Sequence, residues 1–104
     1  MDTFYNDLTP EVAKHLTETC VKPQSFKTFL TKPQYAAWQD EADLPCTYLF
    51  TQKDQCVPYV VQKIMVERSG REFKTETFDM GHSPFVLAPE QIANAVRRAA
   101  GEAL

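Results

Sequence analysis

The fold of this chain is limited above all by how its second half alternates β-favouring runs with helical patterns. Pro45–Phe50 is a short β-favouring run, typical of a strand covered on both faces. From Val57, apolar positions recur at helical spacing until Gly70, where a helix would end. Glu72–Phe78 predicts a second strand, and Pro89 opens a final helix. Strand, helix, strand and helix at these spacings predict an α/β fold with a parallel pair of strands.

The first part of the chain has a different pattern, with short helical pieces that are separated by prolines and rich in aromatic residues. Thr9 is followed by Pro10, a favourable helix start, and Ser25–Leu30 predicts another short helix. Pieces of this kind do not make a compact core alone. We therefore expect residues 1–43 to form a helical, cap-like segment that lies over a β-α-β-α unit made by residues 44–104.

Composition excludes several classes of protein. The chain has 104 residues, of which 43% are hydrophobic and 24% charged, as in an ordinary soluble globular domain. A net charge of −3 argues against a nucleic-acid partner. No apolar run approaches the roughly 20 residues that a membrane-spanning helix needs, and the first residues are too polar for a signal peptide. We expect no membrane partner.

The cysteines argue against both a disulfide scaffold and a structural metal site. Cys20, Cys46 and Cys56 are odd in number and show no C-x-x-C spacing. Free thiols fit a reducing compartment, so the sequence predicts a cytoplasmic protein. We expect neither a metal nor another cofactor.

Each of the two predicted strands is followed by a loop with one ionisable side chain. Asp54 follows the first strand and His82 follows the second, 28 positions later. Because the carboxyl ends of parallel strands share one edge of a sheet, we expect these side chains to lie close together. A carboxylate that holds one imidazole nitrogen leaves the other free as a base. Asp79 is a poorer partner because it ends the strand beside the histidine, and His15 is expected to be an ordinary surface residue.

From Leu44 onward the sequence resembles the C-terminal part of an α/β-hydrolase, closest to small esterases, hydroxynitrile-lyase-like members and their fungal relatives. Pro45–Phe50 is similar to the seventh strand of that fold. Asp54 with Pro58 is similar to the acid loop, and Gly81-His82-Ser83-Pro84 to the histidine loop. The resemblance implies that Asp54 is the acid and His82 the base of a catalytic triad, in the chain order typical of the family.

The residues from Phe4 to Trp38 are similar to the end of the cap that these enzymes place over their active site. The chain lacks the G-x-S-x-G nucleophile elbow of the family, together with its early strands and oxyanion-hole loop. Its glycines stand only at 70, 81 and 101, and its serines only at 25, 69 and 83. One copy of the chain therefore cannot assemble an acyl-enzyme mechanism.

The sequence thus predicts a small α/β-hydrolase-like enzyme whose Asp-His dyad performs general acid–base chemistry without a covalent intermediate. The reaction class would be cyclisation, isomerisation, elimination or addition on a small apolar metabolite, in a setting such as fungal secondary metabolism. Five residues are candidates for contact with this substrate: Phe26, Phe29, Trp38, Cys56 and Ser83.

Two alternatives stay open. The chain can be one part of a serine esterase whose nucleophile lies on another chain, or a non-catalytic binding or dimerisation module derived from a hydrolase. In each case a two-stranded parallel sheet is marginal alone, and its unpaired edge attracts another chain. We expect a homodimer or a second subunit to complete the sheet.

Overall fold

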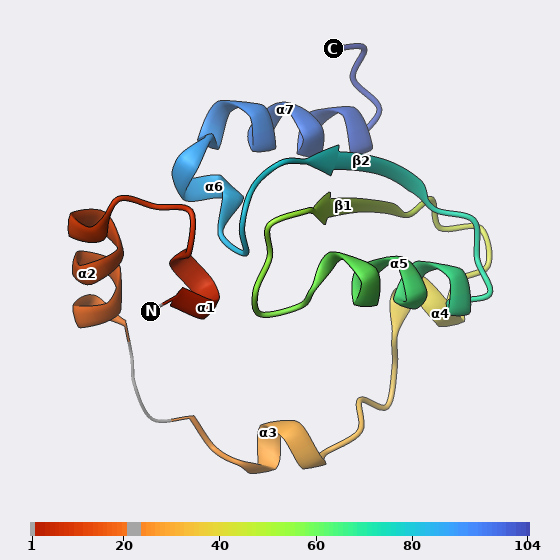
Figure 1. Ribbon diagram of the computed structural model, residues 1–104. Helices are drawn as coiled ribbons and strands as arrows, with labels where there is room; N and C mark the ends of the chain where they lie inside the picture. Colours follow the sequence, from red (N-terminus) through yellow and green to blue (C-terminus); the bar gives the residue numbers. More distant parts are fainter. Residues whose placement is uncertain (1, 21–23) are drawn as a thin grey trace.

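The computed structural model describes residues 2–20 and 24–104 (Figure 1). The elements follow in this order: α1 (Asp2–Tyr5), α2 (Pro10–Thr19), α3 (Lys27–Leu30), α4 (Ala37–Asp40), β1 (Thr47–Thr51), α5 (Tyr59–Arg68), β2 (Lys74–Phe78), α6 (Pro84–Leu87) and α7 (Pro89–Ala99).

The sheet of the described chain consists of β1 and β2, which pair in parallel. The register runs from Thr47 opposite Lys74 to Thr51 opposite Phe78. Helix α5 makes the crossover between the strands and ends just before Gly70, whose φ of 72° is the left-handed conformation typical of a residue after a helix. The predicted α/β class with parallel strands is confirmed. Both strands begin two residues later than predicted, and Thr51 belongs to β1 rather than to the loop.

Helix α2 begins where the sequence predicts. The Thr9 hydroxyl oxygen accepts a hydrogen bond from the Val12 amide at 3.4 Å, and Pro10 occupies the first turn. Two other helices, α1 and α6, were not predicted. Each has only four residues, too few for a hydrophobic period to show.

The core of the domain lies between the strands and the two longer helices of the second half. Helices α5 and α7 lie on opposite sides of the strand pair (Figure 1). Phe50 of β1 is 8% exposed and Ala95 of α7 is fully buried. The small Ala95 side chain lets the helix backbone approach its neighbours closely. This core is small, even for a chain of this length.

A guanidinium group attaches the linker before β1 to the α5–β2 turn. Arg71 donates hydrogen bonds to the carbonyl oxygens of Glu41 (2.7 Å), Ala42 (3.0 Å) and Leu44 (2.6 Å), and also to that of Trp38. Four carbonyl acceptors around one planar donor group hold the end of α4 against the start of the sheet.

The central part of the expected cap-like segment, around helix α3, does not cover the sheet. Helix α3 lies away from the strands in Figure 1, and Phe26 and Phe29 are 73% and 72% exposed. Their rings pack on each other, with centroids 6.3 Å apart. A four-residue helix has too little apolar surface to hold itself against the sheet. Residues 1 and 21–23 of the predicted cap lie outside the described part.

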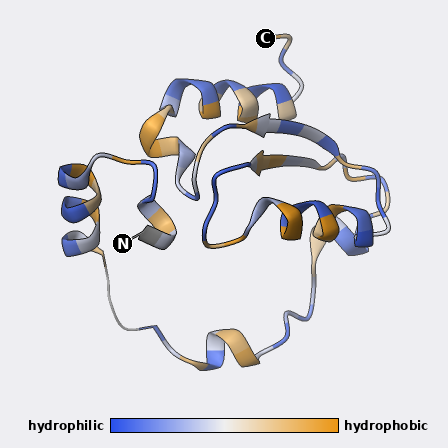
Figure 2. Ribbon diagram, viewed as in Figure 1, coloured by the Kyte–Doolittle hydropathy of each residue, from blue (hydrophilic) through white to orange (hydrophobic). Residues whose placement is uncertain are grey.

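An apolar strip on α5 remains open to solvent. Val60, Ile64 and Met65 are between 41% and 59% exposed, and Figure 2 shows the hydrophobic colour along this helix. The helical spacing of these residues was predicted correctly, but the side that carries them has little to pack against in this chain. None of the helices in the described ranges has the length and hydropathy to cross a bilayer.

Candidate active site

Asp54 and His82 meet at the carboxyl edge of the strand pair. The Nδ1 atom of His82 lies 3.0 Å from Oδ2 and 3.2 Å from Oδ1 of Asp54. Parallel pairing of β1 with β2 brings the two loops to the same edge, as the sequence predicts. The carboxylate side chain is 6% exposed and the imidazole 34%, so the acid is enclosed while the histidine reaches solvent.

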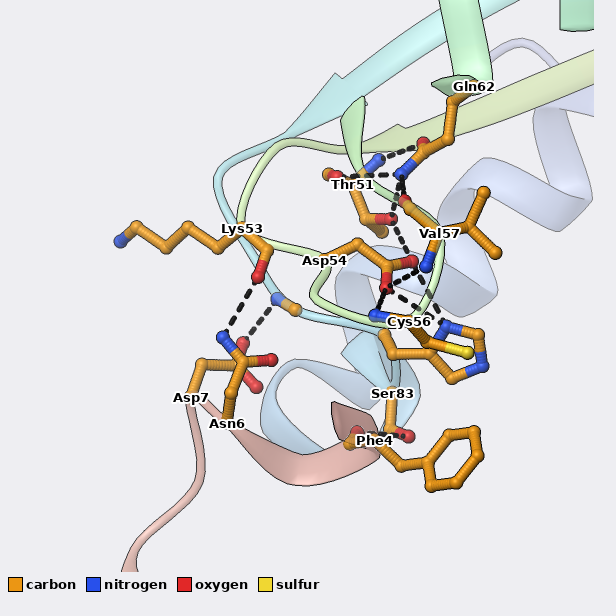
Figure 3. A network of polar contacts seen from close by, with 12 residues as sticks. Phe4, Asn6, Asp7, Thr51, Lys53, Asp54, Cys56, Val57, Gln62 and Ser83 are labelled. Atoms are coloured by element: carbon orange, nitrogen blue, oxygen red, sulfur yellow. Dashed lines mark hydrogen bonds and ion pairs between the residues drawn. The ribbon is translucent and has the colours of Figure 1, made fainter. Parts of the chain in front are cut away.

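The Asp54 carboxyl group accepts hydrogen bonds on both oxygens (Figure 3). Oδ1 accepts from the backbone amides of Cys56 (2.8 Å) and Val57 (2.9 Å), and Oδ2 accepts from the Thr51 hydroxyl (3.0 Å). Burial alone would raise the pKa of Asp54. The hydrogen bonds from Val57, His82, Cys56 and Thr51 outweigh burial and lower the pKa below its ordinary value of 3.8. Asp54 is therefore a carboxylate at neutral pH.

The ionised acid determines which nitrogen of His82 carries the hydrogen. A carboxylate only accepts hydrogen bonds, so Nδ1 of a neutral His82 must be the protonated nitrogen. The lone pair of Nε2 is then available as a base. The ring of Phe4 lies beside the imidazole, with centroids 5.3 Å apart and an edge-on arrangement, and so adds an apolar wall.

Residues before α2 attach to both loops of the site. The Asp7 carboxylate accepts a hydrogen bond from the Gly81 amide at 2.6 Å, and Asn6 Nδ2 donates to the Lys53 carbonyl at 2.8 Å. A Cβ atom at Gly81 would lie 2.5 Å from Asn6 Oδ1 and 2.7 Å from Asp7 Oδ1, so a side chain at position 81 would displace these two groups. Figure 3 shows the two side chains reaching the loops from one short segment.

Two of the five predicted substrate-contact residues lie in the loops of the dyad. The backbone amide of Cys56 donates a hydrogen bond to Asp54. Ser83 is 4% exposed, and its hydroxyl donates to the Phe4 carbonyl at 2.9 Å. The observed role of Ser83 is therefore to attach the histidine loop to α1.

The other three predicted residues are not brought to the dyad in this chain. Phe29 lies on the exposed helix α3, and Phe26 directly precedes that helix. Trp38 packs against Phe73, with ring centroids 6.4 Å apart, in an apolar groove near the beginning of the strands. The dyad lies at the other end of the strands. Substrate contact by these three aromatic residues stays a prediction.

Sequence reasoning missed a buried glutamine that supports the acid loop. Gln62 of α5 is 1% exposed. Its side-chain amide forms hydrogen bonds with the Thr51 backbone and with the Val57 carbonyl. A single polar residue among the apolar positions of a helix gives no signal of this role. Asn6 and Asp7 were missed for a similar reason, because their partners are 47 and 74 positions away. Within the described ranges, no three His, Cys, Asp or Glu side chains gather as metal ligands would.

A parallel α/β unit with a buried aspartate and a histidine in successive loops at its carboxyl edge is the arrangement that the resemblance to the C-terminal part of an α/β-hydrolase implies. The comparison with known proteins agrees. Over 103 residues the chain is 33% identical to the protein named alpha/beta hydrolase nvfD of Aspergillus novofumigatus (strain IBT 16806), and the match covers 99% of this chain. The chain is thus similar to a protein named as an α/β-hydrolase, and the resemblance inferred from the sequence is confirmed.

The match has a restricted extent. The chain spans 40% of the length of this curated relative. No family model matches the sequence. A search of the solved structures also gave no match.

Replacing Asp54 by Asn tests the hydrogen-bonded carboxylate. Because the folded-state pKa is lowered, the ionised group stabilises the fold above its unfolded value of 3.8, and this stabilisation is lost as the pH falls through the lower folded value. Asp54→Asn should therefore lower the free energy of unfolding at pH 7. The free energy of unfolding of this variant should also decrease less steeply as the pH falls below about 4. Urea unfolding at a series of pH values measures both effects.

Asp79→Asn is the matched control, because the Asp79 side chain is 69% exposed in its ion pair with Lys53. The control should leave the acid dependence nearly unchanged. Equal pH profiles for Asp54→Asn and the unsubstituted chain would contradict the assignment.

Proposed function

We propose that the chain is an enzyme in which His82 acts as a general base, and then as a general acid, on a small apolar metabolite. The observation that carries this proposal is the contact of His82 Nδ1 with the buried Asp54 carboxylate, which leaves Nε2 for proton transfer. Asp54 orients the imidazole and stabilises the imidazolium that forms when Nε2 takes a proton.

Some reactions need no catalytic group beyond this dyad, because they proceed by proton transfer without a covalent intermediate. They are cyclisation, isomerisation, elimination and addition. General acid–base catalysis of this kind contributes about 10²–10⁴-fold to a rate. The Phe4 ring beside His82 favours an apolar substrate. A relative from an Aspergillus species supports a setting in fungal secondary metabolism by analogy.

Replacing His82 by Ala should abolish turnover while the fold is kept, because the imidazole is a third exposed and supplies the base. The measurement is mass spectrometry of a fungal metabolite extract incubated with each variant, in search of products that are isomers of a substrate or differ from it by water. His15→Ala, at an exposed position of α2, is the control and should retain activity.

Turnover by His82→Ala equal to that of the unsubstituted chain would remove the dyad from the mechanism. A folded chain that converts nothing in the extract, alone or with other proteins of the same source, would favour the non-catalytic module instead.

A second candidate function is that of a subunit of a serine hydrolase whose nucleophilic serine is on another chain. It is favoured by the match to 40% of a protein named as a hydrolase, together with the absence of a G-x-S-x-G motif from this sequence. In that assembly the Nε2 atom of His82 would accept the proton of the partner's serine.

A serine-reactive fluorophosphonate probe separates the two candidates. If the nucleophile is on another chain, the probe should label a partner protein that copurifies with this chain, and His82→Ala should slow that labelling. A chain that turns over substrate alone, with no labelled protein present, would exclude the second candidate.

We also propose that a second copy, or another subunit, completes the sheet. The open apolar strip of α5 and the two-stranded sheet of the described chain support this assembly. Size-exclusion chromatography with light scattering should therefore give a mass of at least twice the 11.9 kDa of one chain, or coelution with a partner. A well-folded monomer at micromolar concentration would contradict it.

A further inference from the structure

The most enclosed large side chain of the described ranges is polar and lies next to the acid loop. Gln62 is 1% exposed, and all the hydrogen-bond partners of its amide lie in β1 or in the loop after it. Oε1 accepts from the Thr51 amide at 2.9 Å. Nε2 lies 3.0 Å from the Thr51 carbonyl, 3.1 Å from the Thr51 hydroxyl and 2.7 Å from the Val57 carbonyl.

These partners determine the orientation of the Gln62 amide. A backbone N–H can only donate and a backbone carbonyl can only accept. The Thr51 amide therefore requires Oε1 on its side, and the carbonyls of Thr51 and Val57 require Nε2 on theirs. A flipped amide would place like groups against each other at all three contacts.

The orientation of Gln62 then sets the direction of the Thr51 hydroxyl. Nε2 has two hydrogens, which the carbonyl oxygens of Val57 and Thr51 share with the Thr51 hydroxyl oxygen as a third, longer contact. Because Nε2 has no lone pair to accept with, the hydroxyl hydrogen must point elsewhere. The Asp54 Oδ2 atom lies 3.0 Å from the hydroxyl oxygen and, as a carboxylate, can only accept. The hydroxyl hydrogen consequently points at Asp54, along the contact between the two side chains that Figure 3 marks with a dashed line.

From this geometry we infer that Gln62 and Thr51 are positioning residues for the dyad, forming a directional hydrogen-bond relay from Gln62 through Thr51 and Asp54 to His82. Oδ2 receives the Thr51 hydrogen on one side and faces His82 Nδ1 at 3.0 Å on the other. The Cys56 and Val57 amides occupy Oδ1. Rotation of the carboxylate would break several of these bonds at once, so the acid keeps the orientation that suits the histidine.

The inference rests on the proposed function only for its use in catalysis, because the relay itself is a property of the folded chain. Its consequence for His82 is a fixed tautomer, with hydrogen on Nδ1 and a lone pair on Nε2. Neither Gln62 nor Thr51 would contact substrate, since both side chains are buried.

The relay can be tested by the ring ¹⁵N chemical shifts of His82, measured in the full chain with the imidazole in its neutral form. These shifts report the ratio of Nδ1–H to Nε2–H tautomers without any substrate. The unsubstituted chain should show mainly the Nδ1–H form. Thr51→Val removes a hydrogen bond to a charged group, and it should lower the tautomer ratio by about three- to tenfold. Gln62→Met, similar in size but without the amide, should lower it in the same direction.

Two substitutions control for changes that act only through packing. Thr51→Ser keeps the hydroxyl and should restore the ratio. Thr77→Val makes the same chemical change at an exposed position of β2 and should leave the ratio unaltered. If Gln62→Met does not fold, the comparison of Val with Ser at position 51 still decides the matter.

The possible outcomes separate the relay from the function it serves. Unchanged tautomer ratios in folded Thr51→Val and Gln62→Met would overturn the relay and leave the dyad in place. An Nε2–H form in the unsubstituted chain would overturn the dyad and the relay together. Activity retained by His82→Ala, together with the expected tautomer changes in the Thr51 and Gln62 variants, would overturn the proposed function and leave the relay in place.

Discussion

Parallel pairing of β1 with β2 is the constraint on which the site depends. Two parallel strands end at the same edge of a sheet, so the loops after Thr51 and Phe78 must emerge side by side. A carboxylate and an imidazole 28 positions apart thereby come within 3.0 Å. An antiparallel pair would send the two loops to opposite ends, and no local adjustment could bring the side chains together.

Hydrogen bonds, more than apolar packing, determine the structure near the site. Among the described residues, the buried apolar side chains are Ala13, Phe50 and Ala95, two of which are alanines. The buried polar ones are Thr51, Asp54, Gln62 and Ser83, and all four lie in or beside the loops of the dyad. Such a network keeps its geometry because leaving any buried member unpaired is costly. The small core and the ordered site are therefore not in conflict.

Rules about strands and loops, together with the resemblance of these loops to those of the α/β-hydrolases, predicted the Asp54–His82 contact from the sequence. Alternation of strand and helix indicates parallel pairing, and parallel pairing places the loops. Gln62 and Asp7 could not be found in this way, because a single polar residue carries no period and its partner depends on tertiary packing. The position of the cap-like segment also could not be predicted from sequence patterns. Helix α3 has only four residues, so it has no apolar face large enough to determine where it packs.

The exposed apolar surfaces of the chain are separate from the residues that hold the dyad. The apolar strip of α5 and the groove beside Trp38 are open, whereas the hydrogen bonds of Asp54 all come from residues 51–57 and His82 of the same chain. Adding strands to the sheet would cover the open surfaces without supplying any of these bonds. The acid–base pair is thus preorganised within 104 residues. What an additional chain would contribute to the chemistry is a nucleophile or an oxyanion site, because the orientation of His82 is already determined.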